Sequence, residues 1–141
     1  MKVLPWAEFT SDLPEDHIEE GPYIVQFGGK SVAAAIGEML ERLGCTVSPP
    51  IYAHEHGWEL DVQAGRRRMW GQVTLIEGCI FVFEDTSLID KMLGRRNKVY
   101  LDTLMSLSEA LAQDSRFHDV RWYSGADLLT GKPGAKAPVI D

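Results

Sequence analysis

The chain has 141 residues, 45% of them hydrophobic and 25% charged, and its 21 acidic residues against 14 Lys and Arg give a formal net charge of −7. These proportions are ordinary for a globular protein and supply enough apolar residues for one core, so we expect a single domain. The absence of any run of about 18 apolar residues excludes a membrane-spanning helix. An acidic balance argues against non-specific binding to nucleic acid or anionic membranes and favours a basic partner.

The first half of the chain predicts an arm, a strand and a helix. Residues 1–22 contain a run of acidic residues without a sustained period and are expected to form an N-terminal arm that has no signal-peptide core, so we expect a cytoplasmic protein. Residues 23–27 are β-prone and end at a glycine pair, which predicts a first strand. Residues 32–43 carry an apolar stripe between Ser31, a candidate N-cap, and Gly44, a residue typical of helix ends.

The second half begins with a change of period from helical spacing to strict alternation. Trp58, Leu60 and Val62 alternate with polar residues, and the segments 67–77 and 79–84 follow turns, which predicts a three-stranded antiparallel meander. A short turn is expected at 87–94. A second amphipathic helix is expected at 99–112, and a final strand at 119–123.

This order of elements predicts an α+β fold. We expect a two-layer sandwich with a mostly antiparallel sheet of four to five strands, in the order β-α-β-β-β-α-β, and two helices packed on one face. The expected division is an N-terminal arm (1–22), a single α+β domain (23–124) and a flexible C-terminal tail (125–141). Cys45 and Cys79 are too few for a disulfide scaffold and lack metal-ligand spacing, so both are expected to be small buried side chains.

Motifs for chemistry are incomplete throughout the sequence. Residues 28–31 resemble the end of a phosphate-binding loop, but Ile24 occupies the position of the required earlier glycine. His54 and His56 would point to the same side of an extended segment, with Asp61 as a further possible ligand. A small enzyme or a ligand- or metal-binding domain with a pocket at these residues is therefore the alternative function. We assign no catalytic residue, no metal and no cofactor.

The favoured function is a non-enzymatic protein-binding domain that recognises a basic protein partner, as bacterial immunity proteins recognise toxins. Trp70 is expected to face outward beside an arginine-rich turn, and aromatic residues and arginine are enriched at interfaces. The same arginines and those at 95–96 could contact phosphates, but the excess of acids argues against a nucleic-acid partner. The residues expected to contact the partner are Trp70, Arg67, Glu15, Asp16, Glu19 and Glu20.

Three segments carry a resemblance to known proteins. Gly57–Val62, Cys79–Phe83 and Asp119–Tyr123 together resemble segments of a group of small uncharacterised bacterial proteins. The resemblance implies a bacterial origin and a small α+β domain. It implies no activity and no functional residue.

Overall fold

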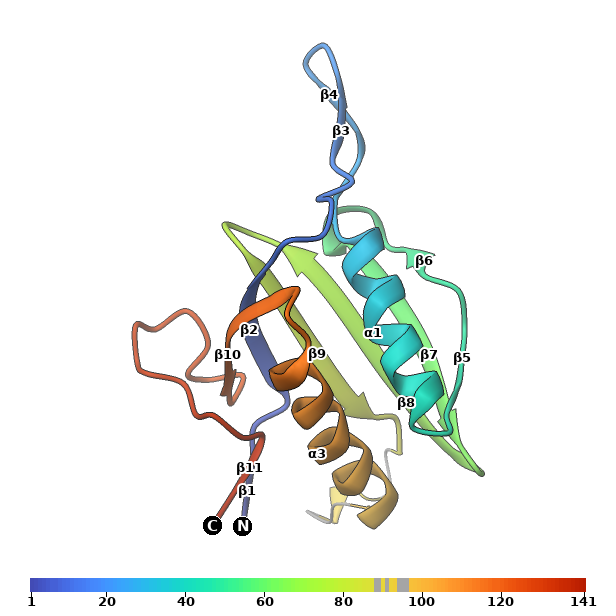
Figure 1. The fold of residues 1–141 in the computed structure, drawn as a ribbon, viewed down its shortest axis with the longest axis vertical. Coiled ribbons are helices and arrows are strands. Elements are labelled where there is room, and N and C mark those ends of the chain that lie inside the picture. Colours follow the sequence, from blue (N-terminus) through green and yellow to red (C-terminus); the bar gives the residue numbers. More distant parts are fainter. Residues whose placement is uncertain (88–89, 91, 94–96) are drawn as a thin grey trace.

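A computed structural model describes residues 1–87, 90, 92–93 and 97–141 (Figure 1). Half of the short turn expected at 87–94, and the arginines at 95–96, lie outside the described residues. The elements in chain order are β1 (Lys2–Val3), β2 (Trp6–Ser11), β3 (Ile18–Glu20), β4 (Tyr23–Gln26), α1 (Lys30–Arg42), β5 (Thr46–Val47), β6 (Ile51–Tyr52), the 3-10 turn η1 (His54–His56), β7 (Trp58–Ala64), β8 (Arg67–Leu75), β9 (Cys79–Asp85), α3 (Lys98–Gln113), β10 (Phe117–Tyr123) and β11 (Val139–Ile140).

Seven strands form the main sheet, in the order β10-β2-β9-β8-β7-β5 with β6 also paired to β7, and every pairing is antiparallel. The α+β class and the antiparallel meander β7-β8-β9 are therefore confirmed, but the sheet is larger than the four to five strands expected. Strand β2 comes from the segment expected to be an arm, where buried Ala7 and Phe9 alternate with half-buried Trp6 and Glu8. Strands β5 and β6 have two residues each, too few to show a period.

The two helices bury their apolar stripes in a shared core. Helix α1 contacts β5, β7 and β8, helix α3 contacts β8, β9 and β10, and the helices touch each other. Figure 1 shows both helices lying in front of the main sheet. Asn97 caps the N-terminus of α3, and its Oδ1 accepts the Val99 N–H at 2.8 Å. None of the helices that the described residues form is long and apolar enough to cross a membrane.

The segment expected to be a flexible tail is partly paired. Strand β11 pairs with β1, which brings the two termini side by side (Figure 1). Ala135 and Trp122 exchange two backbone hydrogen bonds, of 2.8 and 2.9 Å, which attaches the segment to the edge of the main sheet at β10.

Candidate functional site

Strands β3 and β4 form a hairpin that projects from one end of the domain, at the top of Figure 1. The two strands pair antiparallel with each other and form a separate two-stranded sheet, so the strand expected at 23–27 exists but does not enter the main sheet. We call residues 15–27 the acidic hairpin. It contains the four acids expected to contact a partner, Glu15, Asp16, Glu19 and Glu20, and no lysine or arginine.

The projecting strands expose large apolar side chains next to these acids. The exposed fractions are 48% for Ile18, 74% for Tyr23, 47% for Ile24 and 51% for Val25. A two-stranded hairpin has no core of its own and is marginally stable in water. Exposed apolar residues grouped on such an element, in contrast to single scattered ones, are typical of an interaction surface.

The base of the acidic hairpin is fixed to the body of the domain. The Phe27 N–H donates to Tyr52 Oη at 3.0 Å, and the Phe27 carbonyl oxygen accepts from Trp58 Nε1 at 2.9 Å. Trp58 is itself 6% exposed and belongs to the core, so Phe27 is held by a rigid element. Gln26 Nε2 donates to the Asp16 carbonyl oxygen at 2.7 Å and ties the two legs of the hairpin together.

The junction between the acidic hairpin and α1 needs two glycines and an acid. Asp16 Oδ2 accepts the Ser31 N–H at 2.7 Å, and a carboxylate at this place satisfies an unpaired N–H in the first turn of the helix. The expected N-cap, Ser31, is thus a residue inside the helix, and Gly29 with φ 115° is at the cap position. A Cβ on Gly28 would lie 2.3 Å from the Glu15 carbonyl oxygen, so only glycine fits there.

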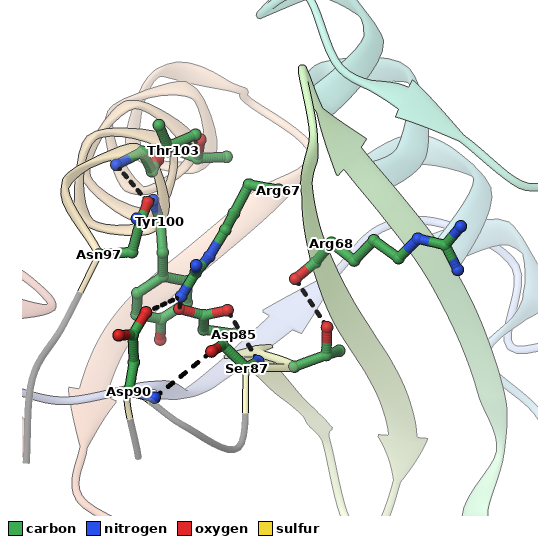
Figure 2. A network of polar contacts seen from close by, with 10 residues as sticks. Arg67, Arg68, Asp85, Ser87, Asp90, Asn97, Tyr100 and Thr103 are labelled. Carbon is green, nitrogen blue, oxygen red and sulfur yellow. Dashed lines mark hydrogen bonds and ion pairs between the residues drawn. The ribbon is translucent and has the colours of Figure 1, made fainter. Parts of the chain in front are cut away.

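Arg67, expected to be an exposed interface residue, is engaged by two carboxylates instead. Figure 2 shows its guanidinium pointing at Asp85 and Asp90, with which it forms ion pairs, and Asp85 also accepts the Ser87 N–H at 3.1 Å. The Asp85 side chain is 3% exposed and that of Arg67 20%. These hydrogen bonds raise the pKa of Arg67, led by the bond to Asp85. Arg67 therefore has a structural contact that competes with any role at an interface.

Trp70 lies half-buried on β8, between its cross-strand neighbours Asp61 and Glu84. A cavity of about 490 Å³ lies at the base of the acidic hairpin and is lined in part by Leu75, which is at the opposite end of β8 from Arg67. Arg67 starts the strand and Trp70 follows three residues later, so the structure does not join these two residues to the four acids in one cluster.

The residues of the alternative pocket are placed apart. His54 and His56 are exposed in η1, not in an extended segment, and His54 has φ 55°. Asp61 lines a cavity of about 580 Å³ with residues of β5 and β8, and neither histidine lines it. Within the described ranges, no group of three or more His, Cys, Asp or Glu side chains could hold a metal ion.

Sequence reasoning singled out the acids of the hairpin but not its exposed apolar residues. The residues that it missed are Ile18, Tyr23, Ile24 and Val25. One signal was available: Gly21-Pro22 directly precedes the β-prone run Tyr23–Gln26, and a two-residue turn with a glycine at φ 61° is typical of a hairpin.

Comparison of the chain with protein-family models, with curated proteins and with solved structures gave no match.

Proposed function

We propose that this chain is a non-enzymatic, cytoplasmic protein-binding domain that recognises a basic protein partner through its acidic hairpin, in the manner of a bacterial immunity protein. The observation that carries the proposal is the projection of an apolar and acidic pair of strands from a base held by hydrogen bonds to Tyr52, Trp58 and α1. Such a surface is costly to a protein that does not use it, because exposed apolar strands promote aggregation.

The fixed base favours binding in energetic terms. Association costs free energy for each loop and side chain that becomes ordered, so a surface already held in one conformation keeps more of its contact energy. Tyr23 and Ile24 provide the apolar contact area, and aromatic residues are frequent among the few residues that dominate an interface. None of the other strands formed by the described residues pairs with β3 or β4, so a partner strand can extend the hairpin.

Charge selects the kind of partner. The acidic hairpin has four carboxylates and no Lys or Arg, and the whole chain has net charge −7, so two copies would repel each other at this surface. A basic protein is attracted to it at long range and binds faster at low salt. The acids at the rim then contribute mainly to the association rate, and the apolar residues to the lifetime of the complex.

The test begins with capture from a bacterial lysate, using the full chain as bait beside a Glu19→Lys/Glu20→Lys variant. A captured protein counts only after it has been purified and its affinity measured by calorimetry at several salt concentrations. We expect a basic protein that binds the wild-type chain and loses at least about tenfold in affinity with the variant, because each attractive pair becomes repulsive.

The matched control is Glu41→Lys/Glu109→Lys, which changes the net charge equally at two exposed helix positions. We expect the control to retain most of the affinity. Equal losses in both variants would show that net charge alone drives binding, and partners that are acidic, or that bind all variants alike, would contradict the proposal.

A further inference from the structure

A cavity of about 490 Å³ opens where the acidic hairpin meets the main sheet. Its wall is formed by the end of β2, the segment that leads to β3, the start of α1 and the turn between β8 and β9. This volume falls within the range of roughly 300 to 1,000 Å³ that is typical of sites for small molecules. The cavity is thus large enough for a long side chain of a bound protein.

The lining combines an apolar part with acidic groups. The apolar residues are Leu13, Pro14, Val32 and Leu75. Glu15 comes from the hairpin base and Glu77 from the β8–β9 turn, and in the described part of the chain neither carboxylate has an ion-pair or hydrogen-bond partner. None of the described residues that line this cavity is Lys or Arg.

Cys79 is a buried residue of the cavity wall, and the pKa of its thiol reflects the electrostatics there. Burial raises the pKa of its thiol to about 11, and the negative charge of Glu15 adds to the effect. Burial, the larger cause, disfavours a charge of either sign, whereas the negative charge of Glu15 disfavours an anion and favours a cation at this place.

A second cavity continues this surface on the other side of the β8–β9 turn. It has a volume of about 140 Å³, shares Thr10, Glu77 and Gly78 with the first, and adds the acids Glu8 and Asp119. Glu77 lines both cavities. The other ionisable residues that line the smaller cavity are the acids Glu8 and Asp119, and those that line the larger one are Glu15, His17 and Cys79.

We infer that the cavity of about 490 Å³ binds an arginine side chain of the basic partner, an inference that rests on the proposed function. The aliphatic stem would contact Leu13, Val32 and Leu75. The guanidinium would donate to Glu15 and Glu77 from two different segments and to the hydroxyls of Thr10 and Ser11. Arginine suits the site better than lysine, because its donors spread over a plane and its hydration is weaker.

The inference is tested by titrating the 15N-labelled full chain with N-acetyl-arginine methylamide and following backbone amide shifts. We expect saturable shifts at residues that line the cavity, such as Val32, Gly78 and Cys79, and weaker binding of the lysine analogue. The norleucine analogue, which has an apolar stem and no charge, should shift these amides little. Glu15→Gln and Glu77→Gln should each weaken binding about two- to fivefold, the effect of a partly exposed ion pair, whereas the control Glu109→Gln should not.

Shifts scattered over the acidic surface, or equal affinities for the arginine, lysine and norleucine compounds, would overturn the inference. The capture experiment is scored separately. A basic partner that binds Glu15→Gln/Glu77→Gln as tightly as wild type would remove the arginine site and leave the proposed function standing, whereas absence of any basic partner would remove the function whatever the small compound does.

Discussion

Asparagine in place of Asp85 would remove one of the two charges that face Arg67 and change little in size. The Asp85 residue is 2% exposed, and the side chains of Arg67 and Asp90 are 20% and 18% exposed. Breaking a fully buried ion pair costs about 3 to 5 kcal/mol, because a charge is left without compensation. In this variant Arg67 keeps its ion pair with Asp90 and some contact with water, so we expect the free energy of unfolding to fall by about 2 kcal/mol.

The assay is urea unfolding followed by tryptophan fluorescence, since Trp58 and Trp122 are buried and will report loss of the core. For a domain of this size, about 2 kcal/mol corresponds to a fall of roughly 6 °C in Tm. The control is Asp102→Asn, which breaks the exposed pair with Lys98, 3.3 Å apart, and should change the free energy of unfolding by less than about 0.5 kcal/mol.

A double-mutant cycle with Arg67→Met separates the contact from other effects of the substitutions. We expect a coupling of at least about 1 kcal/mol between positions 67 and 85, as for residues in one network. A coupling near zero, or a loss for Asp85→Asn no larger than for Asp102→Asn, would refute the structural role that Figure 2 suggests for Arg67.

Three further predictions concern pH, thiol reactivity and the hairpin base. Hydrogen bonds from Arg116 lower the pKa of Asp114 from 3.8 to about 2, so this pair stabilises the fold above pH 3.8 and the stabilisation is lost as pH falls toward 2. Allowing for solvent exposure, we expect the pair to contribute about 1 kcal/mol to the free energy of unfolding. The urea midpoint of Asp114→Ala should therefore change less with pH than that of the wild type. Since both cysteines are buried and the thiol of Cys79 has a pKa of about 11, iodoacetamide at pH 8 should label neither thiol in the native protein and both in urea, and rapid native labelling by mass spectrometry would be inconsistent with this burial. Gly28→Ala would bring a Cβ against the Glu15 carbonyl oxygen and should cost about 1 to 3 kcal/mol in thermal unfolding, so an unchanged Tm would mean that the junction is looser than described.

The helices and the meander could be predicted because each shows its burial pattern locally. The stripe of α1 and the alternation of Trp58, Leu60 and Val62 repeat over enough residues to fix both the element and its buried side. Strand β2 was missed because its alternation occupies six residues next to a stretch of acids that suggested an arm.

The candidate site was only partly predictable, because it depends on contacts between distant segments. A β-prone run such as Tyr23–Gln26 shows that a strand forms but not which sheet it joins. The ion pair of Arg67 with Asp85 joins residues 18 positions apart, and the bond from Trp58 to Phe27 spans 31. Sequence pattern carries no signal for such pairs, so it predicted neither the ion pair of Arg67 nor the hydrogen bonds that attach the hairpin to the domain.

The measurement that tests the central claim most directly is hydrogen exchange of the chain with and without its purified basic partner. The account predicts that amides of residues 18–26, on strands exposed to solvent in the free protein, become protected in the complex while α3 is unchanged. Protection confined to other surfaces, with the acidic hairpin exchanging as fast in the complex as in the free protein, would contradict it.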